Sequence, residues 1–353
     1  MKSKVYFIPM GSSVDDAVFK GGLKKLLDAS RVLDFIRKKD RVAVKIHFGE
    51  EGNAGFIRAR HARIICDEIA LKGAAAFLAD TNTLYRGSRT NSKDHLALAR
   101  KHGFTKKIIG ADVVIPDDTK KEEIIDIPIN QKLIKTAKIA RIFADVDAIA
   151  AVNHFKGHML TGFGGALKNI GMGCATREGK LAQHCDVSPV VYKDKCTGCG
   201  ACEEVCPAGA ISIENEKSVI DKSICVGCAN CMGVCPTTAM FIDFEAGVAA
   251  QMKMVEYASA VLRGKKAGFI NFAVRINKEC DCWGAENTRI SPDIGVFASS
   301  DPVSIDKASL DLTIKICGKD VFREAHPGQD GMVQLKYARE LGLGSLDYEL
   351  IEL

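Results

Sequence analysis

The chain has 353 residues, which suffices for about two domains with a substantial core. Apolar residues make up 47% and charged residues 26% of it, a balance that excludes a disordered or fibrous chain. The net charge of +5, without a dense run of Lys or Arg, argues against a nucleic-acid partner. The unusual feature is the 14 cysteines, most of which are clustered between Cys174 and Cys235.

Strand and helix patterns alternate along the chain, and this alternation predicts an α/β fold with a mixed, mostly parallel sheet. The first half is expected to contain strands over 5–9, 41–46, 75–79, 112–115, 124–129 and 148–152, and helices over 14–37, 59–71, 94–102 and near 132–144. After residue 245, we expect a helix over 246–262, strands over 269–274 and 295–298, and a helix that begins at Ser300-Asp301-Pro302.

The first residues lack the apolar core of a signal peptide. One uncharged stretch, 223–242, is long enough to span a bilayer, but its four Cys, two Gly and one Pro argue against membrane insertion. In a reducing compartment, clustered cysteines bind metals or carry out redox chemistry. We therefore expect a cytoplasmic protein that does not insert into membranes.

Polar side chains follow three of the expected strands. Lys45 and His47 follow the second strand, Asp80 follows the third, and His154 and Lys156 follow the strand over 148–152. Ligands of parallel sheets bind beyond the carboxyl ends of the strands. Lys45 and His47 are therefore expected to line a pocket together with His154.

Two copies of C-x2-C-x2-C-x3-C-P stand 29 residues apart, in a segment predicted to interrupt the α/β domain (1–187 and 246–353) as an insert over 188–245. In this motif, the fourth cysteine of each copy ligates the other cluster. Zinc sites also use C-x2-C pairs and are the alternative. The spacing predicts one [4Fe–4S] cluster on Cys196, Cys199, Cys202 and Cys235, and a second on Cys225, Cys228, Cys231 and Cys206. This cysteine spacing resembles the spacing in the bacterial ferredoxins, and the resemblance implies transfer of single electrons.

A glycine-rich segment precedes the repeat. Gly162, Gly164 and Gly165 are expected to form a tight turn whose free N–H groups, with the N-terminus of the next helix, bind an anion or cofactor. The alternative is a turn that needs glycine only for close packing. Lys168 would be the electrostatic anchor, His158 or His154 the proton donor, and His184 a further pocket residue.

Most of the chain resembles a family of uncharacterised iron–sulfur proteins whose α/β domain of unknown function carries an embedded ferredoxin unit. The matching stretches are 45–50, 80–85, 154–174, the cysteine repeat, 280–282, 293–295 and 300–302. Residues 158–184 are also weakly similar to the nickel-pincer lactate racemase motif. That similarity implies an acid/base role for His158, a cofactor anchor at Lys168 and a nickel ligand at His184, and it favours a related pocket over racemase activity.

The motif Cys280-Asp281-Cys282 is a candidate for a third metal site, with Cys174, Cys185 or a His as a further ligand. Free buried or redox-active thiols are the alternative.

The sequence thus predicts an electron-transfer protein that passes single electrons between two clusters and an anion or cofactor pocket. It would act as an iron–sulfur oxidoreductase or its electron-transfer component, together with a redox protein partner and a small anionic ligand. Two alternatives remain open: a ferredoxin-type carrier whose α/β domain only binds a partner, and a non-redox enzyme with structural clusters.

Overall fold

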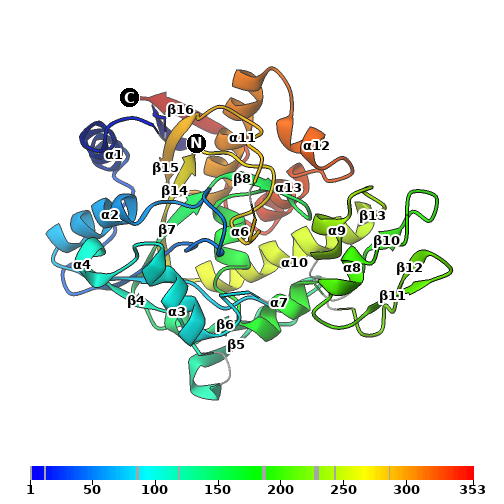
Figure 1. Ribbon diagram of the computed structural model, residues 1–353. Helices are drawn as coiled ribbons and strands as arrows, with labels where there is room; N and C mark the ends of the chain where they lie inside the picture. Colours follow the sequence, from blue (N-terminus) through cyan, green and yellow to red (C-terminus); the bar gives the residue numbers. More distant parts are fainter. Residues whose placement is uncertain are drawn as a thin grey trace.

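An eight-stranded sheet runs through the centre of the molecule (Figure 1). The computed structural model describes residues 2–11, 13–84, 87–117, 120–184, 188–225, 230–241, 244–285 and 287–353. The strand order is β16 (Tyr348–Glu352), β1 (Ser3–Pro9), β15 (Gly295–Ser299), β14 (Lys266–Ala273), β7 (Ala148–His154), β2 (Arg41–Lys45), β3 (Ala75–Ala79) and β4 (Asp112–Val114).

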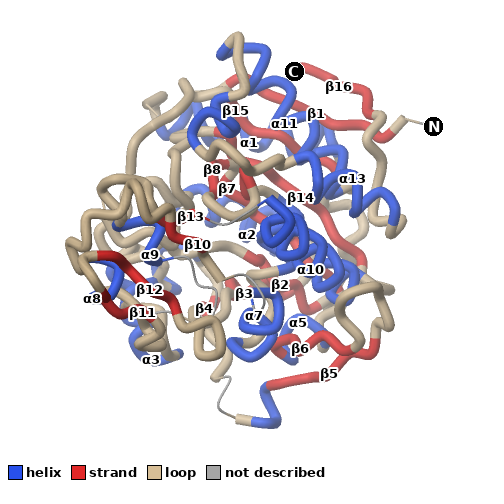
Figure 2. The backbone as a smooth tube through the Cα atoms, turned by 90° about the vertical axis from the view of Figure 1, so that its right-hand side faces the viewer, coloured by secondary structure: helices blue, strands red, loops and turns tan. Residues whose placement is uncertain are grey.

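Among these strands, only β15 runs opposite to its neighbours, which confirms the α/β fold with a mostly parallel sheet. The first and last strands, β1 and β16, pair in parallel, so both ends of the chain lie at the same edge of the sheet, separated by the length of β16 (Figure 2).

Helices cover both faces of the sheet, and the strands alternate between two cores. In β7, Ile149 and Ala151 join one core, whereas Ala148, Ala150 and Val152 join the other, as the two-residue period of a strand dictates. The second core is closed by α1 (Asp16–Ser30), α2 (Ala59–Leu71), α3 (Ser92–Lys101) and α4 (Lys106–Ile109). The first core lies against α5 (Arg141–Ala144), α6 (Ala166–Gly171), α10 (Phe244–Leu262), α11 (Pro302–Cys317), α12 (Val321–Ala325) and α13 (Met332–Glu340).

Local signals set the helix ends. The Asp301 carboxylate accepts hydrogen bonds from the backbone N–H groups of Val303 and Ser304, so α11 begins where it was predicted. The helix predicted over 14–37 is too long, because Arg31 adopts a left-handed conformation (φ 54°) that ends α1.

The helix predicted near 132–144 is wrong. The segment forms β6 (Thr136–Ala140), which pairs with β5 (Ile124–Pro128) after the short helix η1 (Lys121–Glu123), and only α5 is helical. Ala137 and Ile139 are both buried, so a two-residue period prevails over helical spacing.

The residues described between 188 and 241, called the cysteine segment below, lie beside one end of α10 (Figure 1). Its helices α8 (Ala201–Glu204) and α9 (Asn230–Val234) alternate with two small strand pairs. These pairs join β10 (Val190–Val191) to β13 (Met240–Phe241) and β11 (Ile211–Glu214) to β12 (Lys217–Ile220). The two copies of the repeat fold alike: Gly209 and Thr238, at equivalent positions, both have positive φ. Whether this segment is a ferredoxin-like insert with boundaries at 188 and 245 stays a prediction.

Candidate functional site

A cavity of about 140 Å³ lies beyond the carboxyl ends of β2, β3 and β7. It brings together six residues that the sequence predicted to form a pocket: Lys45, His47, His154, His158, Lys168 and His184, the last from α7 (Arg177–His184). Asp80, Arg89, Lys156, Lys180 and Glu279 also line it, so the cavity has more cationic than anionic side chains. Such a lining favours an anionic ligand.

The glycines of the predicted anion turn are not among the described lining residues. Gly162 and Gly164 belong to β9 (Gly162–Gly164), which pairs with β8 (Lys156–His158) in a hairpin that the sequence did not predict. Gly162 has φ +73°, and a Cβ there would lie 2.9 Å from the backbone nitrogen of Gly331. The alternative reading, glycine for close packing, therefore describes these positions.

The N-terminus of α6 already holds an anion, which is the Asp306 carboxylate of α11. It accepts hydrogen bonds from the backbone N–H groups of Ala166 (2.7 Å) and Leu167 (3.0 Å). Gly165 is needed here, because a Cβ would lie 2.2 Å from Oδ1 of Asp306. The prediction that these N–H groups are free for an external anion is wrong, since a side chain 140 positions away occupies them.

Lys45 and Asp80 form the floor of the cavity. Both are buried, and the Lys45 ammonium lies 2.9 Å from the Asp80 carboxylate and donates to Oδ1 of Asn169 at 2.7 Å. Arg89 approaches Asp80 at 3.4 Å. Burial by itself would raise the pKa of Asp80, but the surrounding cations hold it below its usual value.

His154, one of the two predicted proton donors, has both ring nitrogens engaged. Nδ1 lies 2.8 Å from the Asp281 carboxylate, and Nε2 lies 2.9 Å from the carbonyl oxygen of Val274, which only accepts. Lys156 flanks the same carboxylate at 3.8 Å. Burial alone would raise the pKa of Asp281, but His154 and Lys156 lower it to about 2. His154 therefore holds Asp281 in place, and its protons are committed to the protein.

His158 and His47 each bind the backbone through one ring nitrogen. Nδ1 of His158 accepts from the backbone N–H groups of Leu160 and Thr161, each at 3.2 Å, and Nδ1 of His47 accepts from that of Gly49 at 2.9 Å. The ring proton of each therefore lies on Nε2. Burial, with nearby cations such as Lys168 and Arg89, holds the pKa of both rings well below the usual value. At neutral pH, both are uncharged hydrogen-bond donors.

Lys168 is the cation without a protein partner: among the described residues, its ammonium makes no hydrogen bond or ion pair. Burial and the neighbouring Lys156 lower the pKa of Lys168 to about 7. A bound anion would compensate this charge and raise that pKa.

The sequence analysis missed Glu279. Its carboxyl group lines the cavity, its buried Oε2 accepts no hydrogen bond from the described residues, and burial raises its pKa to about 7. Its position next to Cys280 was the available signal, but the sequence cannot show that a glutamate is buried.

Cys280 and Cys282 also line the cavity, and the structure pairs them as a disulfide. A paired disulfide has no thiolate for a metal, and Cys174 lies in the hydrophobic core instead. Cys185 is outside the described residues. In the described parts of the chain, no three His, Cys, Asp or Glu side chains converge as the ligands of one ion would. The third metal site stays a prediction for the reduced protein.

A second, much smaller cavity lies in the cysteine segment. Its lining includes Cys196, Cys199 and Cys202 from the first copy of the repeat and Cys235 from the second. The backbone N–H of Ser218 lies 3.4 Å from Sγ of Cys196, and that of Ala239 lies 3.2 Å from Sγ of Cys235. Hydrogen bonding to Ser218 lowers the pKa of Cys196, so these surroundings favour thiolates.

The other predicted ligand set is only partly described. The backbone N–H of Ala210 lies 3.2 Å from Sγ of Cys206, which matches the contact of Ala239 with Cys235 one repeat later. Cys231 is buried and Cys225 is half-buried, whereas Cys228 lies outside the described residues.

Two solved structures are similar to this chain. The lactate racemase apoprotein from Thermoanaerobacterium thermosaccharolyticum is 13% identical, with a TM-score of 0.45, over 86% of this chain and 55% of that one. A protein from Thermotoga maritima is 13% identical, with a TM-score of 0.45, over 87% of this chain and 59% of that one. The chain thus spans less than two thirds of either structure.

In the described part of the chain, no helix is both long and apolar enough to cross a bilayer. A model of the family described as Domain of unknown function (DUF362) matches residues 42–311, and the chain therefore belongs to this family.

Proposed function

We propose that this chain is an iron–sulfur redox protein. Its cysteine segment holds two [4Fe–4S] clusters and exchanges single electrons with a small anion bound in the cation-lined cavity. The observation that carries the proposal is the position of Cys235, which joins three cysteines of the other repeat copy around one small cavity. This is the crossed arrangement expected of a two-cluster ferredoxin motif.

A [4Fe–4S] cluster and a single zinc ion make different demands on four cysteines. The four cysteines of a [4Fe–4S] cluster each bind a different iron atom, so they stand farther apart than the ligands of one zinc ion. Four cysteines from both copies of the repeat line this cavity, as the ligands of one cluster would. Backbone N–H groups that face the sulfur atoms, as those of Ser218 and Ala239 do, stabilise thiolate ligands and influence cluster potential.

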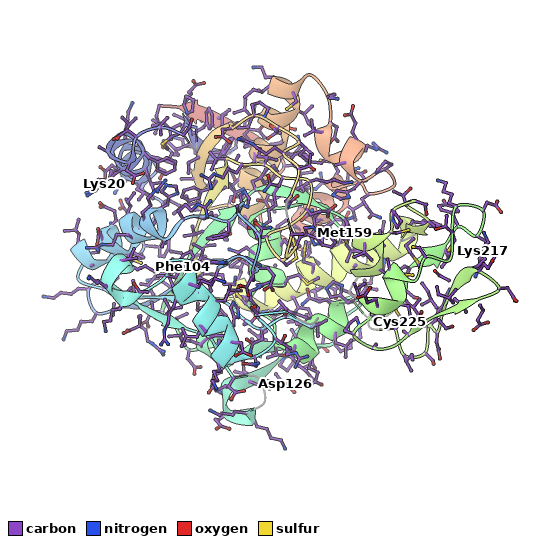
Figure 3. All side chains as sticks on the ribbon, in the orientation of Figure 1. Lys20, Phe104, Asp126, Met159, Lys217 and Cys225 are labelled. Atoms are coloured by element: carbon purple, nitrogen blue, oxygen red, sulfur yellow. A yellow bond between two sulfur atoms is a disulfide. The ribbon has the colours of Figure 1, made fainter. Side chains whose placement is uncertain are left out.

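Packing links the cysteine segment to the large cavity. Met232 packs against the hydrophobic core of the segment, and it also packs against the small cluster formed by Leu160 and Ala250. Leu160 and Met159 line the large cavity. In Figure 3, Met159 lies on the side of the main body toward Cys225. The bound clusters would supply single electrons across this short contact, and a redox protein partner would exchange them at the outer surface.

The chemistry of the large cavity indicates the class of ligand. The unpaired Lys168 ammonium would anchor a carboxylate or phosphate, and the Nε2–H groups of His158 and His47 would donate hydrogen bonds to it. We therefore propose an oxidoreductase over a simple carrier, because a carrier does not need an unpaired lysine in a cavity.

The test is anaerobic purification followed by iron and sulfide analysis and electron paramagnetic resonance after dithionite. We expect about eight iron atoms per chain and the signals of reduced [4Fe–4S] clusters. Cys235→Ser should lose about half of the iron, whereas Cys317→Ser, outside the repeat, should lose none. Colourless protein, or protein that contains zinc in place of iron, would overturn the proposal.

A second measurement separates an enzyme from a carrier. Inorganic phosphate should shift the cluster potential of the wild-type protein, and the shift should disappear in Lys168→Ala. If phosphate does not bind, and electron exchange with a partner is the same in both proteins, the chain is a carrier.

A further inference from the structure

The motif Cys280-Asp281-Cys282 lies at the wall of the cation-lined cavity. Both cysteines line it, and they are bonded to each other rather than to a third cysteine. The half-buried Trp283 covers the same wall. A disulfide at this place is a group that can accept electrons within reach of a cavity ligand.

The loop that carries the pair is fixed by buried contacts. The Asp281 carboxylate lies against His154 and Lys156, and the backbone carbonyl of Asp281 accepts from Glu50 N–H at 2.9 Å. Asn53 Nδ2 donates to the carbonyl of Trp283 at 3.0 Å. These contacts engage Asp281 and the loop backbone while both sulfur-bearing residues face the cavity, so the pair can open and close without unfolding the loop.

The surroundings also suit the reduced form. The backbone N–H of Cys282 lies 3.3 Å from Sγ of Cys280, where it would stabilise a thiolate. The Lys168 ammonium and the Glu279 carboxyl group line the same cavity and can supply protons.

We propose that Cys280 and Cys282 are a redox-active pair that stores two electrons received from the clusters. This inference rests on the proposed function. One electron from a reduced cluster adds to the disulfide and gives its radical anion. A second electron completes cleavage of the S–S bond to two thiolates, and two protons then yield two thiols. The clusters are reoxidised by one electron each, so the pair converts two single-electron steps into one two-electron unit.

The experiment is a reductive titration of the cluster-loaded protein under anaerobic conditions, after its iron content has been measured. Wild-type protein and Cys317→Ser should each take up about four electrons per chain, one for each cluster and two for the disulfide. Cys280→Ser should take up about two. Alkylation followed by mass spectrometry should label Cys280 and Cys282 after reduction and neither before it.

A variant without clusters tests whether electrons reach the disulfide through the clusters. In Cys199→Ser combined with Cys225→Ser, the disulfide should stay oxidised under the same titrant and time. The inference is wrong if iron-loaded wild-type protein stops at two electrons with the disulfide intact. It is also wrong if the two thiols are free before reduction or bind zinc or nickel afterwards. Protein without clusters would instead refute the proposed function, and this inference with it.

Discussion

The central sheet and the cysteine segment differ in what fills their interiors. The sheet lies between two cores of large side chains such as Phe269, Phe297 and Phe48. The core of the cysteine segment contains four buried residues, Cys202, Ile211, Cys231 and Met240, half of which are predicted cluster ligands. Apolar burial can therefore hold the sheet together by itself, whereas we expect the segment to depend on the clusters proposed to bind its cysteines.

This difference concerns function as well as stability. The large cavity is built on strands of the sheet and is held by ion pairs such as Lys45–Asp80, so its shape does not need the clusters. The segment would supply electrons to a site that is already formed. Variants of four residues, Cys199, Asp281, Lys168 and Tyr192, test this difference between the sheet and the segment.

The largest change in a measured rate is expected from loss of a cluster. Cys199 is exposed, so Cys199→Ser should act through cluster binding alone. If the segment loses about 3 kcal/mol of local stability, trypsin should cleave it about 100-fold faster while the sheet domain remains intact. Limited proteolysis with mass spectrometry measures the sites, and Cys317→Ser is the control. Equal protease resistance of the variant and the wild type would show that the segment folds without clusters.

The next effect concerns the sheet domain. Asp281→Ala leaves His154 and Lys156 without their shared carboxylate, and breaking such a buried pair should cost about 3–5 kcal/mol in urea denaturation. Asp126→Ala removes only an exposed pair with Lys138, so the loss should stay below about 1 kcal/mol.

The pH dependence of this loss follows from the lowered pKa. The pKa of Asp281 is about 2 in the folded protein and about 4 in the unfolded chain. The stabilisation of the folded protein by ionised Asp281 is therefore complete above about pH 4, and it disappears as the pH falls toward 2. A difference between the wild type and Asp281→Ala that does not shrink over this range would contradict the assigned ion pair.

Lys168→Met should weaken phosphate binding while it stabilises the ligand-free protein. Phosphate affinity should fall about 30-fold, which is the loss of about 2 kcal/mol from one charged hydrogen bond. The ligand-free protein should gain about 1 kcal/mol in thermal denaturation, because an unpaired, half-buried charge is gone. Lys106→Met, on the exposed surface, should change neither quantity.

The pH dependence of phosphate affinity tests the role of Lys168 independently. Because the pKa of Lys168 is about 7, wild-type phosphate affinity should decrease above pH 7 as the ammonium loses its proton. Lys168→Arg should keep its affinity there. Calorimetric titration at several pH values measures this, and a flat wild-type profile would remove Lys168 from the site.

The smallest effect is expected within the cysteine segment when its clusters are bound. The Tyr192 ring stacks on Phe241 with centroids 3.8 Å apart. Tyr192→Ala should therefore lower the stability of the loaded segment by about 1 kcal/mol, visible as about fivefold faster proteolysis. Glu214→Ala, on an exposed hairpin, should remain within about 0.5 kcal/mol of the wild type. An effect of Tyr192→Ala as large as that of cluster loss would mean that side-chain packing holds the segment.

Most of the sheet could be predicted because its signals are local. Short, continuous apolar runs over 41–46, 75–79 and 148–152 predicted three strands, and the carboxyl ends of β2, β3 and β7 meet at the cavity. The segment near 132–144 was assigned the wrong period. Its strand β6 is stabilised by pairing with β5 and by Glu256, which accepts from the backbone N–H of Ile134 at 2.6 Å. Glu256 lies 122 positions away, so no local pattern could reveal it.

Local patterns along the chain were sufficient to predict the mostly parallel α/β sheet and the lysines and histidines that meet at its edge. The sequence also set the repeat spacing from which the cluster ligands are predicted. The chemistry open to each pocket side chain, in contrast, depends on contacts between residues that are distant in the chain. Asp306 reaches the N-terminus of α6 and occupies the predicted anion site, and the carboxylate of Asp281, 127 positions away from His154, engages Nδ1 of that ring in a hydrogen bond. The physical reason is that hydrogen-bond partners and burial set the charge of a side chain, and both are supplied here by residues distant in the chain.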